Sequence, residues 1–169
     1  MNNIAHIVNY VKPHPCGYFG DPIKPCRCLP GQIAYYQKRI SGPIMDRIDL
    51  HIDLPPVTPE KLISSSLSES SKKVKKRIQI ARDIQVRRYR QIKKVCNGDL
   101  NSQQVKEYIL LSPDCIRLLK QAVATLHLSA RTYYKAIKIA RTIADLTCKK
   151  EISSEHLAEA LQYRPKECT

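Results

Sequence analysis

Four side chains of the types that bind zinc lie within one short stretch near the start of the chain, namely His14, Cys16, Cys26 and Cys28. The surrounding segment, 13–30, is rich in proline and glycine and carries too few apolar residues to form a hydrophobic core. Thiolates and imidazoles are preferred zinc ligands, and four of them complete a structural site with no open position for a substrate. We therefore expect zinc to hold this segment together. The alternative is a loop with free thiols, because the Cys-x-Cys spacing is tighter than in common zinc fingers.

The other cysteines are scattered along the chain, and the total of seven is odd. The first residues lack the basic and small-residue features of a secretory signal, so a disulfide framework is not expected. No apolar run is long enough to span a bilayer. These features predict a cytoplasmic protein without a membrane partner, in which a metal site and ordinary reduced thiols account for the cysteines.

Two arginines stand out by their positions. Arg131 falls in the first turn of a helix predicted from Ser129 onward, where a cation is unfavourable for the helix dipole. A residue placed against local preference points to a functional role, here the binding of phosphate. Arg47 lies among acidic residues in ISGPIMDRIDLHIDLP, residues 40–55, beside a predicted strand. From spacing alone, we expect Arg47 and its acidic neighbours in residues 40–55 to form an ion-pair cluster on the surface.

A strongly basic helix is predicted over 72–97. It holds eleven Lys or Arg residues against one acidic residue, in a chain with a formal net charge of +14. Like charges one turn apart cost helix stability, so this excess favours a polyanion partner, and a solvated surface is the alternative. Further along, Lys135, Lys138 and Arg141 are expected only to coat the polar face of their helix. The residues expected to contact nucleic acid are Lys72, Lys73, Lys75, Lys76, Arg77, Arg87 and Arg88.

The elements that must position these side chains fall into two parts. Residues 1–56 carry two predicted strands, 4–11 and 48–54, with a helix over 31–40 between them. Two strands cannot form a stable sheet by themselves. The first part therefore reads as a fragment of an α/β domain.

A Pro- and Ser-rich linker over 57–70 precedes the second part, residues 71–164, which is followed by a short tail at 165–169. Capping residues and apolar periodicity predict that the helices after the basic one begin at Asn101, Ser112 and Ser129 and span 154–162. The expected fold class is an α/β fragment followed by an all-α helical bundle, mostly helical overall. The 169 residues contain no GxxxxGK[ST] loop and no strand that ends in paired acids for Mg²⁺.

Several stretches together resemble a known family. They are PHPCGYFGDPIKPCRCLPGQI, ISGPIMDRIDLHIDLP, LSARTYYKAIKIARTIADL and HLAEALQYR, and they resemble the C-terminal part of the magnesium-chelatase-like AAA+ ATPases of the ComM (YifB) type. The resemblance covers about residues 12–164. It implies a ring, usually a hexamer, in which this part joins an AAA+ core and neighbouring subunits. ComM-type members are linked to DNA branch migration in natural transformation, and magnesium chelatases insert metal into porphyrins.

The resemblance also assigns roles to the two arginines. Arg47 corresponds to the arginine finger that reaches a neighbour's nucleotide, and Arg131 corresponds to sensor 2 of the helical lid. Both roles suit a guanidinium, which stabilises the charge on a transferred phosphoryl group in an ATP and Mg²⁺ site. The Walker A and Walker B regions belong upstream in this family, so the chain alone is expected not to hydrolyse ATP.

The chain departs from the family's pattern at two positions. His14 replaces the first cysteine of an NPCPCG-like insertion, a change that keeps a zinc ligand, and Lys12 replaces an Asn at the sensor-1 position. Two alternatives to an ATPase portion that serves DNA processing stay open. One is a stand-alone, zinc-stabilised basic module that binds nucleic acid, and the other is a magnesium chelatase subunit.

Overall fold

The computed structural model describes residues 15–18, 24–39, 45–52, 54, 57, 63 and 68–165. They belong to two compact units, the first formed by Met1–Arg47 with Asp53–Ile63 and the second by Ile48–Ile52 with Ser64–Thr169. The strand expected over 4–11 and the tail from residue 166 onward lie outside the described residues, as do Lys12 and His14.

The first unit contains one described helix, α1 (Pro30–Arg39), which confirms the helix expected over 31–40. Pro30 occupies the first helical position, where its fixed φ is suited to the helix and its missing N–H costs nothing. The Gln32 side chain accepts a hydrogen bond from the Leu29 N–H at 3.1 Å, just before the helix begins. Local chemistry therefore sets the start of this helix.

The α/β part of the expected fold class is not confirmed. Residues 48–52, the described part of the strand expected over 48–54, have no strand ladder, so that prediction is wrong there. The alternating apolar side chains Leu50 and Ile52 are 49% and 63% exposed. A strand is stable only when its backbone pairs with neighbours, and the described residues provide no strand partner for this segment.

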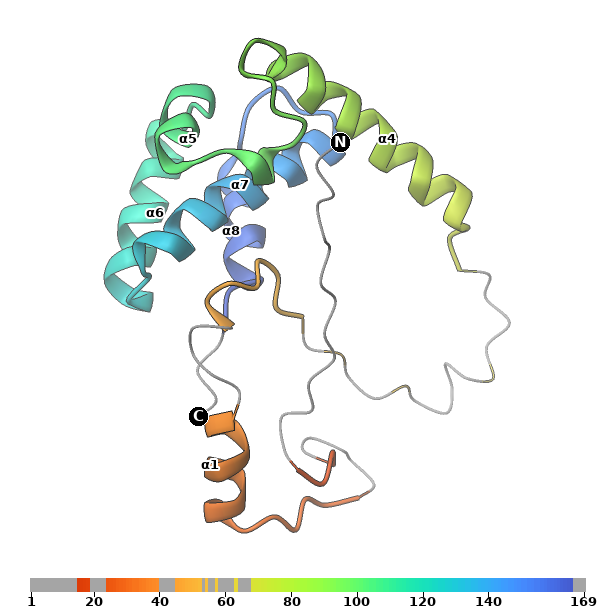
Figure 1. The fold of residues 1–169 in the computed structure, drawn as a ribbon, viewed down its shortest axis with the longest axis vertical. Coiled ribbons are helices and arrows are strands. Elements are labelled where there is room, and N and C mark those ends of the chain that lie inside the picture. Colours follow the sequence, from red (N-terminus) through yellow and green to blue (C-terminus); the bar gives the residue numbers. More distant parts are fainter. Residues whose placement is uncertain are drawn as a thin grey trace. The chain divides into compact units, whose positions relative to one another are not determined.

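The second unit is helical, as expected (Figure 1). Its elements are α4 (Ser71–Arg88), two 3-10 turns η1 (Arg90–Ile92) and η2 (Asn97–Asp99), α5 (Ser102–Tyr108), α6 (Pro113–Leu126), α7 (Ala130–Leu146) and α8 (Ser154–Gln162). The basic helix ends at Arg88 and not near residue 97, because the chain then turns through η1 and a left-handed residue, Lys93, with φ of 55°. None of the described helices is long and apolar enough to cross a membrane.

Side-chain caps begin four of these helices at the positions that the sequence indicates. Ser112, Ser129 and Ser153 each accept a hydrogen bond from a backbone N–H in the first turn of the helix that follows. Asn101 and Gln104 form a reciprocal capping box at the start of α5. Such caps satisfy backbone donors that have no partner inside the helix, and each contributes about 1 kcal/mol.

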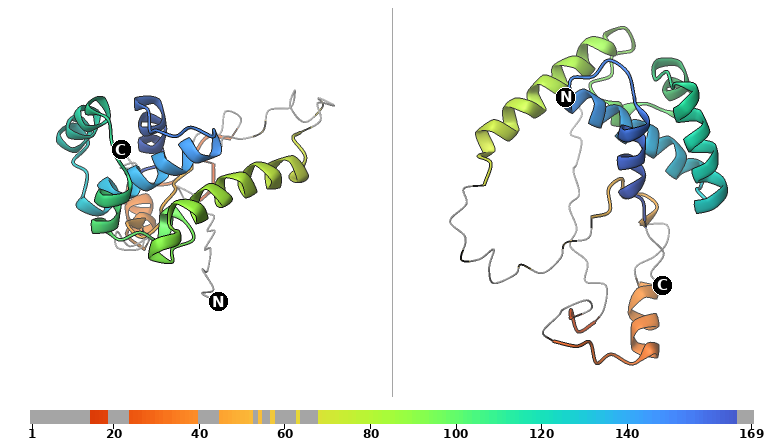
Figure 2. Two further views of the ribbon diagram at one scale, coloured as in Figure 1. Left: turned by 90° about the horizontal axis from the view of Figure 1, so that it is seen from above. Right: turned by 180° about the vertical axis from the view of Figure 1, so that it is seen from behind.

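The core of the second unit is built around α7, which packs against α4, α5 and α8 (Figures 1 and 2). Ala140 and Ala144 are fully buried on α7, and their small side chains let neighbouring helices approach closely. A single parallel bridge joins Leu111 to Ile152 among the described residues. The other buried residues of this core are Tyr89, Leu100, Val105, Ile109, Cys115, Leu119, Ile137, Ile152, Leu157 and Ala160.

The N-terminal half of α4 extends beyond the other helices of its unit (Figure 2). Ala81 and Gln85 on the inner face of α4 are buried, but Ile78, one turn earlier on the same face, is 47% exposed. Val95, after the end of this helix, is also half exposed. The bundle covers only the C-terminal half of this helix.

Candidate functional site: a cysteine cluster and helix α7

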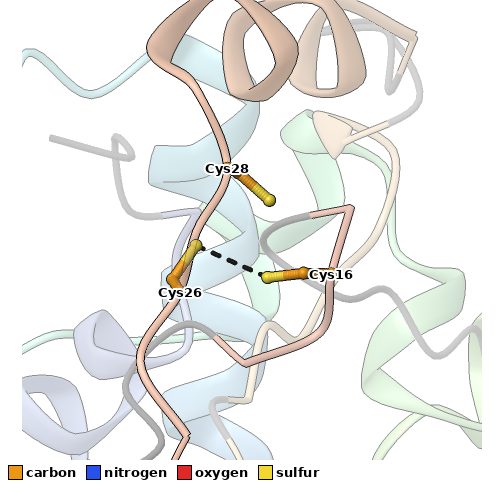
Figure 3. A group of neighbouring side chains, drawn as sticks. All are labelled: Cys16, Cys26 and Cys28. Carbon is orange, nitrogen blue, oxygen red and sulfur yellow. Dashed lines mark hydrogen bonds between the residues drawn. The ribbon is translucent and has the colours of Figure 1, made fainter.

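Three of the four expected zinc ligands lie together in the first unit (Figure 3). The sulfur atoms of Cys16, Cys26 and Cys28 all lie within 4.8 Å of one another, and the thiol of Cys16 contacts the Cys26 sulfur at 3.4 Å. All three side chains are half-buried, and none forms a disulfide. The fourth expected ligand, His14, lies outside the described residues.

The backbone around Cys16 is shaped to favour a thiolate. Gly17 has φ of 76°, in the left-handed region that glycine adopts without strain, and this turn directs the Tyr18 N–H at the Cys16 sulfur, 3.4 Å away. The hydrogen bond from Tyr18 lowers the pKa of Cys16. The pKa of Cys28 is raised, chiefly because its thiol keeps its proton in a hydrogen bond with the Cys16 sulfur. A bound cation would take the place of that proton and favour a thiolate at both positions.

The cluster fits a zinc ion on geometric grounds. Zn–S bonds of about 2.3 Å in a tetrahedron place two sulfurs about 3.8 Å apart, within the 4.8 Å that encloses the three sulfurs here. The described part of this segment offers no buried apolar side chains that would hold the three thiols together otherwise, since Tyr18 and Leu29 are both exposed. The residues present therefore suit a structural zinc ion, and its presence stays a prediction.

Arg131 lies in the first turn of α7, as the sequence predicts, and its side chain is exposed. The hydroxyl of Ser129 accepts a hydrogen bond from the Thr132 N–H at 3.2 Å, which fixes the start of the helix around Arg131. Arg47 is exposed in a turn of the first unit. The two arginines lie in different units, so their assigned roles in a nucleotide site stay predictions.

The segment after Arg47 belongs to the second unit and contacts α7. The Nζ of Lys135 donates to the Ile48 carbonyl at 2.9 Å and lies 3.5 Å from an Asp49 carboxylate oxygen. Lys138 donates to the Gly98 carbonyl at 3.1 Å, and burial lowers the pKa of its ammonium. The expectation that these lysines only coat a polar face is wrong, because both are half-buried and donate to backbone carbonyls.

The cations of α4 divide into two groups. The side chains of Lys72, Lys73, Lys75, Lys76 and Arg77 are exposed on the half that extends beyond the bundle, and Arg77 pairs with Glu69 at 3.2 Å. Arg87 is also exposed. Arg88 differs, because its guanidinium forms a bidentate ion pair with Asp145 at 2.6 and 2.9 Å. Arg88 therefore has a structural partner, and its expected contact with nucleic acid stays a prediction.

Asp145 is the centre of a buried polar network that the sequence does not reveal. Its side chain is fully buried, and it accepts hydrogen bonds from Arg88, from Arg141 at 3.1 Å and from Asn97 at 3.0 Å. Arg141, also expected to be on the polar face, is instead 4% exposed. Its two remaining nitrogens donate to the carbonyls of Lys149 and Lys150. Every charged group of this network therefore has partners.

Asn97 and Tyr89 extend the same network. The Tyr89 hydroxyl donates to Asn97 Oδ1 at 2.7 Å, and Asn97 Nδ2 also contacts Thr142 Oγ1 at 2.9 Å. Burial alone would raise the pKa of Asp145, but the hydrogen bonds from Arg88 and Asn97 and the charge of Arg141 outweigh burial and lower it. Asp145 is therefore a stable carboxylate that joins α4, η2 and α7, and not a candidate acid or base.

Comparisons with known proteins agree with this organisation in two parts. Residues 68–164 match the family described as magnesium chelatase, subunit ChlI C-terminal, and residues 3–62 match the family described as magnesium chelatase, subunit ChlI. The match over residues 3–62 ends before the basic helix α4, and the match over residues 68–164 begins just ahead of that helix. Together they cover most of the chain.

Two curated relatives match nearly the whole chain. An uncharacterized protein YifB of Salmonella typhimurium is 37% identical over 160 residues, and the competence protein ComM of Haemophilus influenzae is 35% identical over 159 residues. Each match covers 94% of this chain and 30% of the relative, so the chain spans about a third of their length. The chain belongs to the magnesium chelatase subunit ChlI family and is similar to its YifB and ComM members.

Proposed function

We propose that this chain is the lid-bearing portion of a magnesium-chelatase-like AAA+ ATPase of the ComM type. In this proposal, Arg131 acts as sensor 2 on the nucleotide of its own subunit, and Arg47 acts as the arginine finger on a neighbour's nucleotide in a ring. The observation that carries the proposal is the pair of family matches, which include the stretches around both arginines. The AAA+ core and the ring neighbours are the partners that it requires.

The placement of Arg131 supports a contact with phosphate. It lies at the positive end of a helix of 17 residues whose start is fixed by the Ser129 cap. A guanidinium at that point adds a forked donor to the helix dipole, and both favour the oxygens of a bound nucleotide. Arg47 is exposed, which leaves it able to reach a neighbouring subunit. Both groups would stabilise charge on the transferred phosphoryl group.

The test is ATP turnover by a chimera in which this chain replaces the matching 30% of the Haemophilus influenzae relative. We expect Arg47→Ala to lower kcat by about 10³-fold or more, as is typical of an arginine finger. Arg131→Ala should lower kcat and should also raise KM for ATP, because Arg131 contacts the bound nucleotide in this proposal. The matched control is Arg117→Ala, which removes an exposed arginine of α6 that pairs with Asp114. Unchanged turnover in both test variants would refute the two roles.

The extended half of α4 favours DNA as the polyanion on which the ATPase acts. Five cations lie exposed within two turns of one helix, and the single described ion pair among them is itself exposed. Charges of this kind bind phosphate backbones with an affinity that falls steeply with salt. This feature also suits a stand-alone nucleic-acid-binding module, and it favours DNA processing over porphyrin chemistry for the whole protein.

DNA binding by the chain itself is measured by fluorescence anisotropy over a range of salt concentrations. Replacing Lys72, Lys73, Lys75 and Lys76 by Ala should make the logarithmic salt dependence of the affinity shallower by about 0.9 for each DNA phosphate that these lysines neutralise. The control replaces four exposed lysines elsewhere, Lys106, Lys120, Lys149 and Lys150, and so changes the net charge equally. Equally weakened binding in both variants would mean that overall charge, and not α4, attracts DNA. ATP turnover separates the two functions, because a stand-alone module requires none.

A further inference from the structure

We propose that Lys135 is a positioning residue, which ties the segment 48–52, and through it Arg47, to the lid helix α7. The part of this inference that concerns Arg47 rests on the function proposed above. The part that concerns the tie between 48–52 and α7 rests only on contacts within the second unit.

The tie is made by a cation on a backbone carbonyl. Lys135 Nζ lies 2.9 Å from the Ile48 carbonyl oxygen, and its side chain is only 16% exposed. A hydrogen bond from a charged donor is stronger than a neutral one, and partial burial protects it from competition by water. The Asp49 carboxylate, 3.5 Å from the same ammonium, is 73% exposed and adds little. The carbonyl contact is therefore the main attachment.

A second contact holds the other end of the segment. The His51 N–H donates to the Tyr163 carbonyl at 2.9 Å, at the end of α8. Leu50 and Ile52 are about half or more exposed, so these two apolar side chains contribute little to holding the segment. Because the two polar contacts attach the segment at separate points, loss of the Lys135 contact should loosen it against the helices.

The position of Lys135 on α7 links the contact with Ile48 to the two arginines of the proposed function. Lys135 follows Arg131 by four residues, so the two side chains share one face of the helix, one turn apart. Arg47 directly precedes Ile48 in the chain, so its Cα lies about 3.8 Å from the Cα of the residue that Lys135 holds. The proposed sensor 2 and the proposed arginine finger are thus attached to neighbouring turns of one helix.

This attachment would couple the two arginines during turnover. Contact between Arg131 and a bound nucleotide would rotate α7, and the Ile48 carbonyl would move with Lys135. An arginine finger depends on accurate placement, because an error of about 1 Å in a catalytic group can cost 100-fold in rate. The lid of one subunit would in this way set the position of the arginine that it offers to its neighbour.

The tie itself is tested by hydrogen exchange on this chain. Lys135→Met keeps the length of the side chain and removes the donor, and we expect the amides of 48–52, His51 above all, to exchange about tenfold faster. The matched control is Lys138→Met on the same helix, whose ammonium donates to the Gly98 carbonyl instead. It should leave exchange in 48–52 unchanged. Equal exchange rates in Lys135→Met and the unaltered chain would overturn the proposal.

The functional part is tested in the chimera described above. Lys135→Met should lower kcat about tenfold or more without changing KM for ATP, because it displaces the finger and leaves Arg131 in place. Lys135→Arg, which still donates to a carbonyl, should restore most of the rate. Faster exchange in 48–52 with an unchanged kcat would overturn the positioning role. If Arg47→Ala leaves kcat unchanged, the proposed function fails, while the exchange result still decides whether the tie exists.

Discussion

The cysteine cluster of the first unit and the Asp145 network of the second unit are two polar groups that are stabilised in different ways. The three sulfurs of the cluster lie close together and repel one another when they ionise. Asp145 is held between two arginines that the fold itself supplies. A segment without apolar burial therefore gains most from an added ion, whereas a helical bundle can satisfy a buried charge with its own side chains.

The two regions also differ in their exposure to solvent. The cysteines are half-buried, so water and metal can reach them, but the Asp145 side chain has no exposed surface. A buried carboxylate is tolerated only where cations and hydrogen-bond donors surround it, and removing one member leaves the others uncompensated. The network should therefore govern the stability of the helical unit, and the cluster should govern only its own segment.

The largest effect is expected from Asp145→Ala, which leaves Arg141 buried without its carboxylate. We expect a loss of about 3–5 kcal/mol in the free energy of unfolding of the helical unit, measured by urea denaturation followed by circular dichroism. Asp114→Ala is the matched control, because it removes an exposed carboxylate that also pairs with an arginine. That variant should lose less than about 1 kcal/mol. Similar losses in the two variants would contradict the importance of burial.

The cysteine cluster provides the second prediction. Purified protein should contain about one zinc ion per chain, and Cys28→Ser should weaken zinc binding by at least about 100-fold, since even outer-shell partners contribute 10- to 100-fold. Competition with a chromogenic chelator measures the affinity. Cys148→Ser removes an exposed cysteine outside the cluster and should have no effect. Chelation should leave the urea transition of the helical unit unchanged, and a shared transition would contradict the independence of the two regions.

The smallest effect concerns pH. Because the pKa of Asp145 is lowered in the folded chain, its ionised form contributes stability that is present above the unfolded pKa of about 3.9 and is lost as the pH falls through the folded pKa. Asp145→Asn cannot titrate. The difference in unfolding free energy between this variant and the unaltered chain should stay constant above about pH 5 and shrink below about pH 4. A difference that does not change with pH would refute the linkage.

Much of the helical unit can be predicted from local sequence signals, because caps and apolar spacing act within a few residues. Ser112 followed by Pro113 and the Asn101–Gln104 pair mark helix starts that the structure confirms. The three clustered cysteines are also close in sequence, with Cys16 and Cys26 only 10 positions apart, so a short loop suffices to bring them together. Local chemistry determines each of these features.

The Asp145 network could not be found in this way, because its members come from distant parts of the chain. Arg88 and Asp145 are 57 residues apart, and Arg141 with Asp145 looks like an ordinary pair on a helix surface. The available signal was the neighbourhood of Ala140 and Ala144, which places both charged residues beside the buried face. The alternation of Leu50 and Ile52 predicts a strand for a similar reason, since a local pattern says nothing about whether a pairing partner is present.

The extended half of α4 would enlarge any small movement of the bundle, because it is a straight helix held at one end only. Its residues 71–80 continue past the last covered positions, Ala81 and Gln85, and at a rise of 1.5 Å per residue they reach about 15 Å further. A rotation of about 10° at the covered end would therefore move Ser71 by roughly 2.6 Å. Small adjustments of the bundle are amplified along this arm, and the cations that it carries would move with it along any polyanion that they hold.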